Sequence, residues 1–265
     1  MFRKPVFIIV AAALLLLVSC SRYQKLLKSS DNNQKYERAL VYYEKGDYYR
    51  SMQLLEQLQS IFNGTDKSEK ISYYYAYCYY QQGDFMSASY YFKRFAKNFP
   101  SSKFAEECAY MSAYCNYLDS PDYNLDQTNT LEALKEMQLF INTYPNSERV
   151  QQCNDLMDKL RAKLERKAFE IAQLYLKMSD YKAAIISYKN VLKEYPDTPH
   201  KEQILFDLLK ANYKYAVNSI TSKQKERYQA AMDAYNIFAS AFPESSQMSQ
   251  AKSMYKNSQK ALEIQ

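Results

Sequence analysis

Apolar residues recur along the chain at offsets of 0, 3, 7, 10 and 14 residues, with proline at offset 15 in most copies. The stretch FMSASYYFKRFAKNFP, residues 85–100, shows the pattern in full. These offsets place the apolar side chains on one face of a helix. Proline ends such a helix because it has no amide N–H and disfavours helical geometry in the residue before it. The copies begin at Tyr48, Phe85, Thr130, Tyr181 and Tyr228.

A second helical pattern, Tyr-x-x-Ala-Tyr-x-x-Tyr, precedes each of these segments. It is complete at residues 73–80 and 110–117 and looser in the other copies. Its small central residue allows a paired helix to approach closely. The sequence therefore predicts five helix pairs. Their central alanines are Ala39, Ala76, Ala113, Ala172 and Ala211.

The turns inside the pairs, KGDYYRS, QGDFMSA and MSDYKAA, complete a resemblance to tetratricopeptide repeats over residues 33–243. Ser102, Ser147, Thr198 and Ser245 are expected to cap the following helices. The breaker-free stretch up to Met178 predicts one long helix, and residues 245–263 predict a capping helix. The expected fold class is all-α: a tetratricopeptide-repeat superhelix of about five helix pairs plus a C-terminal capping helix.

Three departures from a regular repeat are visible. The first copy has Asn63 where the others have proline, so Gly64 is expected to make that turn. The third and fifth copies each carry an eight-residue insertion between their two helices. In the third copy the insertion is expected to form a loop with the sequence DSPDYNLDQ.

The N-terminus reads as a bacterial lipoprotein signal. Arg3 and Lys4 precede an apolar run that is too short for a membrane span, and Leu-Val-Ser-Cys follows it. This resembles a lipobox, which implies cleavage before Cys20 and a covalent lipid on that cysteine. The alternative is an ordinary signal peptide with a chance cysteine. Ser21, rather than Asp, favours the outer membrane, with the protein anchored at its periplasmic face.

The predicted domains follow from these patterns. They are the lipoprotein signal peptide, residues 1–19; a lipid-anchored linker, residues 20–32; the N-terminal repeats 1–3, residues 33–146; and the C-terminal repeats 4–5 with the capping helix, residues 147–265.

Composition narrows the function classes. Loss of Arg3 and Lys4 with the signal lowers the formal charge from +6 to +4, and no basic block stands out, so nucleic acid is not expected as a partner. Cys78, Cys108, Cys115 and Cys153 are expected to be small buried residues. With His200 as the sole histidine, the sequence predicts no metal site, no catalytic residue and no cofactor besides the lipid on Cys20.

Tyrosines of the first helix in each pair are candidates for a binding surface. In a tetratricopeptide array these helices line the concave groove, and tyrosine offers a broad apolar ring with one polar group. Packing of the rings between helices is an equally open alternative. The residues assigned to a substrate-peptide groove are Tyr36, Tyr43, Tyr73, Tyr77, Tyr80, Tyr114 and Tyr117, with Tyr110 beside them.

The whole set of features resembles the BamD family, the lipoprotein subunit of the outer-membrane β-barrel assembly machine. The phrases YYEKGDYYRSMQLLEQL, NGTDKSE, YYFKRFAKNFPSS, LFINTYPNSERV and SKQKERY carry the resemblance, together with the lipobox. It implies a non-enzymatic scaffold whose N-terminal repeats bind unfolded outer-membrane proteins. It also implies that the C-terminal repeats dock on a BamA-like barrel protein through its periplasmic domains.

Partner docking is assigned, by analogy of region, to the fifth helix pair and its insertion. The residues are Lys223, Lys225, Glu226, Arg227 and Tyr228. Two other functions remain open. One is a different tetratricopeptide-repeat envelope lipoprotein, acting near peptidoglycan or in gliding or secretion. The other is an enzyme on a helical superhelix, such as a lytic transglycosylase.

Overall fold

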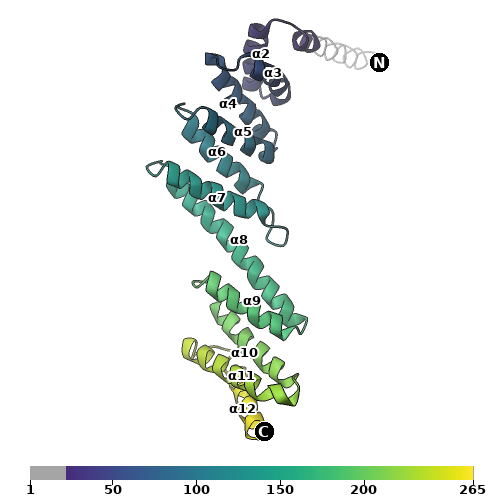
Figure 1. Ribbon diagram of the computed structural model, residues 1–265, viewed down its shortest axis with the longest axis vertical. Coiled ribbons are helices and arrows are strands. Elements are labelled where there is room, and N and C mark those ends of the chain that lie inside the picture. The colour runs from purple at the N-terminus through teal and green to yellow at the C-terminus, as the bar shows by residue number, and fades with distance from the viewer. Residues whose placement is uncertain (1–21, 265) are drawn as a thin grey trace, which may run out of the picture. The chain divides into compact units, whose positions relative to one another are not determined.

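The computed structural model of the chain describes residues 22–264, and within this range no β-strand occurs. The predicted signal peptide and Cys20 lie outside the described residues. None of the helices searched is both long and apolar enough to cross a membrane. The helices follow one another as Figure 1 labels them. They are α2 (Asn32–Glu44), α3 (Tyr48–Ile61), α4 (Asp66–Gln81), α5 (Phe85–Asn98), α6 (Ala105–Leu118), α7 (Thr128–Thr143), α8 (Val150–Lys177), α9 (Tyr181–Glu194), α10 (Lys201–Val217), α11 (Thr221–Ala241) and α12 (Met248–Glu263).

The predicted all-α fold with paired helices is confirmed. The pairs are α2 with α3, α4 with α5, α6 with α7, the end of α8 with α9, and α10 with α11. α12 occupies the place of the predicted capping helix, and α8 is the predicted long helix. α5, α7, α9 and α11 are each followed by an aromatic C-cap residue and then by proline. The amide N–H of the aromatic residue donates to the carbonyl four residues earlier. For the first helix of each pair we write A helix, and for the second B helix.

The tight turns inside the pairs use a left-handed residue followed by an aspartate. Gly46 and Gly83 have φ of +76° and +79°, a region that costs glycine no steric strain. Ser179 takes the same position with φ of 62°. The aspartate that follows each of them accepts a hydrogen bond from the amide three residues on, and so caps the B helix. Gly64 makes the predicted turn with φ of +75°.

The predicted helix caps at Ser102, Ser147, Thr198 and Ser245 need a correction. α6 begins three residues after Ser102, and the Ser102 hydroxyl accepts from the amide of Phe104 at 3.0 Å instead. The other three residues make the same contact two residues on. These residues therefore stabilise the turn that leads into α6, α8, α10 and α12, and the helix itself begins three residues later.

Small residues at the centre of each pair let the two helices meet. The central alanines Ala39, Ala76, Ala113, Ala172 and Ala211 are all at most 1% exposed. In the first pair the Ser51 hydroxyl donates to the carbonyl of Ala39 at 2.8 Å. The predicted apolar face is likewise buried, with Phe92, Met137 and Phe238 at 0% exposure.

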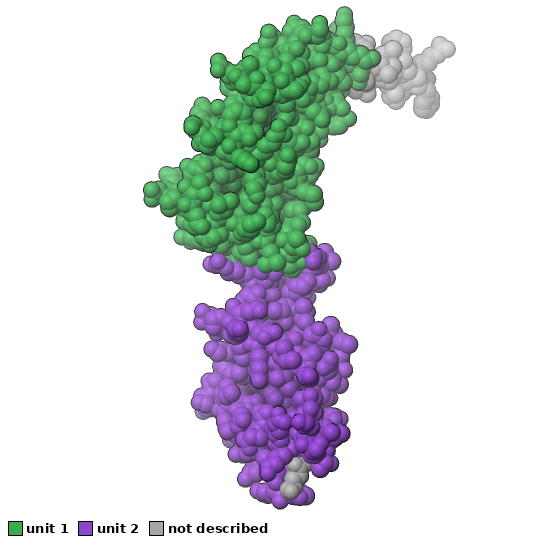
Figure 2. Space-filling model, viewed as in Figure 1, with its two compact units in different colours: residues 1–121, 127–157 green, residues 122–126, 158–265 purple. Residues whose placement is uncertain are grey.

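The chain forms two compact units, each with its own core, as Figure 2 shows by colour. Unit 1 contains the described residues up to Pro121 and residues Gln127–Met157. Unit 2 contains Asp122–Asp126 and the chain from Asp158 onward. The division falls within α8, further along the chain than the predicted division after residue 146. The predicted division into substrate-binding and partner-docking halves stays a prediction.

The two insertions are accommodated differently. The insertion of the third copy is a loop between α6 and α7, as predicted. Its segment 122–126 belongs to unit 2, where the Arg166 guanidinium lies 4.1 Å from the centre of the Tyr123 ring and Lys167 donates to the carbonyl of Leu125. In the fifth copy the added residues instead lengthen helices, because α10 ends at Val217 and α11 already begins at Thr221.

The segment predicted as a linker is not a free tether. Residues 22–27 are helical, and Tyr23 is only 5% exposed. Its hydroxyl donates to Gln53 Oε1 at 2.7 Å, and its ring meets that of Tyr42 edge-on at 5.7 Å. This segment therefore packs onto the first helix pair, because Tyr23 buries its ring there.

Candidate functional site

Unit 1 carries aromatic rings on its A helices, as a chain of ring contacts from α2 to α4 and a separate stack on α6. The chain of contacts starts at Tyr43 on α2, whose ring centre lies 4.8 Å from that of Tyr74 on α4. Tyr74 in turn contacts Tyr73 at 5.4 Å, and Tyr73 contacts Tyr77 at 4.8 Å. We call the surface that these rings form the tyrosine face. Its members are Tyr43, Tyr73, Tyr74, Tyr77, Tyr80, Tyr114 and Tyr117, all half-buried.

On α6 the rings form a regular stack. Tyr110, Tyr114 and Tyr117 follow one another at helical spacing, with ring centres 5.7 Å and 6.0 Å apart and interplanar angles of 12° and 13°. Spacings of four and three residues place side chains on one side of a helix, which explains the alignment. Of these rings, Tyr114 and Tyr117 are half-buried and reach the surface, whereas Tyr110 lies buried at the start of the stack.

The tyrosine face is held in place from below by phenylalanines of the B helix. The Tyr77 ring meets the fully buried Phe92 ring edge-on at 4.8 Å, and the Tyr80 ring lies 5.8 Å from that of Phe85. Each tyrosine therefore packs one part of its ring in the core and leaves another part at the surface. Such anchored rings lose little conformational freedom when a ligand binds.

Two hydroxyl groups of the tyrosine face, those of Tyr73 and Tyr77, are held in their protonated form by their surroundings. The Tyr77 hydroxyl donates to Glu107 Oε1 at 2.5 Å. Burial and this carboxylate raise the pKa of Tyr77 well above its usual 10.0, and burial raises that of Tyr73 to about 12. Both groups thus stay protonated and place polar atoms beside the apolar rings, although the Tyr77 proton is donated to Glu107.

The assignment of Tyr36 to the groove, made from the sequence, is corrected by the structure. It is 5% exposed and packs in the core of the first pair, against Phe62. The Lys67 ammonium lies 4.7 Å from the centre of its ring and covers it. Tyr110 is buried too, at 3% exposure, beneath the guanidinium of Arg149. The other six assigned tyrosines lie on the tyrosine face, but their role in binding stays a prediction.

Tyr74 was missed by the repeat pattern although its ring joins α2 to α4. It falls outside the Tyr-x-x-Ala-Tyr-x-x-Tyr template, and the only sequence signal was the unbroken run of three tyrosines at 73–75. By contrast Tyr75 turns away from the tyrosine face, is 3% exposed and shares a hydrogen bond of 3.1 Å with Tyr79.

The residues assigned to partner docking fall into two groups. Lys223, Lys225 and Glu226 are exposed on the first turns of α11. Arg227 is instead engaged within the protein: its guanidinium lies 3.7 Å from the centre of the Tyr215 ring and donates to the Ser219 hydroxyl. Tyr228, at 8% exposure, belongs to the core rather than to a docking surface, which corrects that assignment.

Two apolar residues beside these charges were not anticipated. Val217 at the end of α10 is 43% exposed, and Ile220 just before α11 is 72% exposed. The signal available in the sequence was a lone isoleucine in the polar stretch NSITSKQKER.

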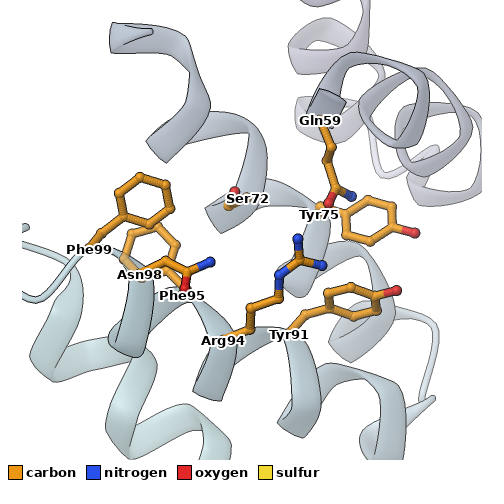
Figure 3. Close-up of a pocket in the computed structure, with 8 residues that line it drawn as sticks. All are labelled: Gln59, Ser72, Tyr75, Tyr91, Arg94, Phe95, Asn98 and Phe99. Atoms are coloured by element: carbon orange, nitrogen blue, oxygen red, sulfur yellow. The ribbon is translucent and has the colours of Figure 1, made fainter. Parts of the chain in front are cut away.

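The hollow shown in Figure 3 lies elsewhere in unit 1, between α3, α4 and α5. Gln59, Tyr75 and Arg94 are among its lining residues, and the Arg94 side chain extends toward the other two. Its volume is about 10 Å³. A space of that size accommodates about one water molecule. It is therefore a packing defect rather than a ligand site.

The cysteines have the predicted packing role. Cys78, Cys108, Cys115 and Cys153 are each 0% exposed and unbridged. Burial raises the pKa of the Cys115 thiol to about 12, which keeps it neutral and unreactive. Among the residues searched, no group of three His, Cys, Asp or Glu side chains could hold a metal ion. His200 stacks on Phe169, with ring centres 4.4 Å apart.

Tandem helix pairs joined by tight turns form an all-helical repeat fold of the tetratricopeptide kind. Residues 28–226 match the YfiO family, described as an outer membrane lipoprotein. The chain belongs to this family of outer membrane lipoproteins. The match includes the tyrosine face and ends inside the first turns of α11.

Individual relatives are more distant. The outer membrane protein assembly factor BamD of Caulobacter vibrioides is 28% identical over 116 residues, which cover 44% of this chain and 36% of that protein. A tetratricopeptide-repeat protein from Bacteroides fragilis is similar over 87% of this chain and 99% of its own, with 14% identity and a TM-score of 0.38. For the tetratricopeptide domain of P58(IPK) the coverage is 95% and 68%, the identity 15% and the TM-score 0.39.

Proposed function

We propose that this protein is a non-enzymatic, lipid-anchored scaffold of outer-membrane β-barrel assembly. Membership of the YfiO family and the likeness to an outer membrane protein assembly factor support this reading. A lipid on Cys20 would hold the chain at the periplasmic face of the outer membrane. Unfolded outer-membrane proteins are the substrates in this proposal, and a BamA-like barrel protein is the partner.

The tyrosine face is the observation that carries the proposal. The half-buried rings of Tyr77 and Tyr80 are fixed by Phe92 and Phe85, so they offer apolar area with little loss of side-chain entropy on binding. Hydroxyl groups along the same surface supply polar contacts to a peptide backbone. This combination suits an extended peptide that ends in an aromatic residue, which is what the family resemblance implies for the substrate.

Partner docking is assigned to the start of α11 in unit 2. Lys223, Lys225 and Glu226 are exposed there, and the exposed Ile220 adds an apolar contact. Apolar centres surrounded by charged residues resemble protein interfaces, in which the charges orient the partner. Arg227 would act indirectly, because it holds the α10–α11 corner through Tyr215 and Ser219.

The test is binding of a labelled peptide from the C-terminal strand of a barrel protein, ending in phenylalanine. The double variant Tyr77→Ala with Tyr114→Ala removes two rings from different A helices of the tyrosine face. We expect the Kd to rise by at least tenfold, because burial of an aromatic ring contributes about 1–3 kcal/mol. Fluorescence anisotropy measures the change.

A matched control replaces two exposed tyrosines outside the tyrosine face. Tyr49 and Tyr90 are 58% and 60% exposed, so Tyr49→Ala with Tyr90→Ala should leave the Kd unchanged. Equal affinity of the wild type and the Tyr77/Tyr114 variant, with both folded by circular dichroism, would refute the assignment of the peptide site.

A further inference from the structure

A second surface feature lies within unit 2, between α8, α9 and α10. It is a pocket of about 280 Å³. Its inner wall is formed by the fully buried Tyr188 and the half-buried Leu176 and Tyr181. Its outer part carries Lys177 and Lys214, both exposed. The pocket therefore combines an apolar wall with a cationic rim.

The pocket exists because of two changes from the repeat pattern. In unit 1 the rings of Tyr77 and Tyr80 lie against Phe92 and Phe85. The corresponding positions of α8 carry Gln173 and Leu176, which are slimmer than tyrosine. The space that rings fill in unit 1 is thus left open beside Tyr181 and Tyr188.

Positive charge in the pocket is not neutralised from within. Its lining contains three lysines, Lys177, Lys210 and Lys214, and one acid, Asp207, a net charge of +2. Asp207 is 5% exposed and already accepts hydrogen bonds from the Tyr188 hydroxyl at 3.1 Å and from Gln203 Nε2 at 2.9 Å. Among the described residues, none of the three ammonium groups is in an ion pair. The lysines are therefore free to bind external carboxylates.

Gln173 adds a polar group of a different kind. It lines the pocket, is half-buried, and its carboxamide makes no hydrogen bond to other residues of the described part. A carboxamide offers one acceptor and two N–H donors, which match the N–H and C=O of a peptide bond. A bare phosphate would use only the donors and would leave the apolar wall uncovered.

We infer that this lysine pocket docks an acidic peptide segment of a partner protein. A bulky apolar side chain of the segment lies against Leu176 and Tyr181, and flanking carboxylates pair with Lys177, Lys210 and Lys214. The amide of Gln173 binds the peptide backbone. The site shares no residue with the tyrosine face or with the start of α11, so the inference stands whether or not the barrel-assembly proposal is correct.

The experiment uses the full-length protein in non-ionic detergent and a short labelled peptide in which Asp and Glu flank a central leucine. Lys210→Ala with Lys214→Ala should raise the Kd about tenfold, equivalent to about 1.4 kcal/mol. The matched control is Lys252→Ala with Lys256→Ala, which removes two exposed lysines from α12. The control should change the Kd less than twofold.

A second variant separates the shape of the pocket from its charge. Gln173→Tyr installs the residue that unit 1 has at this position and should fill the pocket without altering any charge. We expect it to weaken peptide binding as much as the lysine variant does. It also keeps the test decisive if the double lysine variant fails to fold.

Three results would overturn the inference. One is equal binding of a peptide with serine in place of the central leucine, because the apolar wall would then be unused. Another is equal loss in the α12 control, which would indicate non-specific attraction. The third is binding of vesicles containing anionic lipid, lost on mutation of Lys210 and Lys214, without any binding of the peptide. That result would assign the lysines to a membrane surface.

Discussion

The A helices of the two units share one architecture but expose different side chains, aromatic rings in unit 1 and a lysine-rimmed pocket in unit 2. In unit 1 they carry Tyr73, Tyr77 and Tyr80, and the rings cover the B helix beneath them. In unit 2 the corresponding positions of α8 carry Phe169, Gln173 and Leu176, and a pocket with a lysine rim remains. The repeat framework thus sets where side chains emerge, while their size decides whether the surface is a filled aromatic strip or an open cationic pocket.

The difference extends to how each unit satisfies its buried groups. Unit 1 buries its cysteines and tyrosines largely against other apolar atoms, and its one buried carboxylate among the described residues, Glu136, is paired with Lys93 at 2.6 Å. Unit 2 buries Asp207 and supplies it with two donors, from Tyr188 and Gln203. Burial of a carboxylate costs little stability as long as both of its hydrogen-bond donors remain. Burial of a thiol or phenol costs little only while the group is neutral.

The largest expected difference between the two units is in their stability at alkaline pH. Burial raises the pKa of Tyr73, Tyr110 and Cys115 to about 12 and that of Cys153 to about 11, above the usual 10.0 for tyrosine and 9.0 for cysteine. The folded state holds these protons more tightly than the unfolded state does. The buried groups therefore contribute their full stabilisation at any pH below their usual pKa values. This stabilisation is lost as the pH rises through 11–12.

Unit 2 also buries a phenol with a raised pKa, that of Tyr188. All four described cysteines and the tyrosines named above belong to unit 1, which therefore has more such groups and should unfold first. Limited proteolysis after a jump to alkaline pH, with fragments identified by mass spectrometry, measures the order. Earlier cleavage in unit 2 would contradict the expectation.

Removal of the ring beneath the tyrosine face should have the next largest effect. Phe92 is 0% exposed, and Phe92→Ala should cost about 3–5 kcal/mol of unfolding free energy because it leaves a cavity. Urea unfolding followed by circular dichroism measures it. Tyr90→Ala, on the same helix but 60% exposed, should stay within about 0.5 kcal/mol. A similar cost for both variants would show that Phe92 does not support the tyrosine face.

The counterpart in unit 2 should be less sensitive. Tyr188→Phe keeps the ring but removes the hydroxyl that donates to Asp207, and should cost about 1–3 kcal/mol. Gln203 still donates to the carboxylate, which limits the loss. Tyr181→Phe is the matched control, since Tyr181 is half-buried and its hydroxyl makes no hydrogen bond within the described residues. Equal urea midpoints for the two variants would argue against a structural role of the Tyr188–Asp207 bond.

Exposure of particular side chains was the part of the candidate site that could not be predicted. Tyr36 fits the same template position as Tyr73, yet Lys67 from the next A helix covers its ring. Tyr228 begins the fifth B-helix pattern, and its burial agrees with that pattern rather than with a docking role. Lys93 is exposed, but it also pairs at 2.6 Å with Glu136, which is 6% exposed.

The sequence by itself determined the elements and their pairing. Local rules suffice for this. Prolines end the B helices, glycines in the left-handed region followed by aspartates make the turns, and one central alanine in each pair lets its two helices pack closely. The long helix α8 followed in the same way from the lack of any breaker between residues 150 and 177.

Only the tertiary structure decided which rings remain at the surface, that residues 22–27 pack onto the first helix pair, and that Gln173 and Leu176 leave a pocket. Each of these depends on side chains from elements distant in sequence, such as Tyr23 with Gln53 or Tyr188 with Asp207. A repeat pattern specifies the direction of a side chain from its own helix. It does not specify how far the neighbouring helix reaches over that side chain, and that reach determines burial.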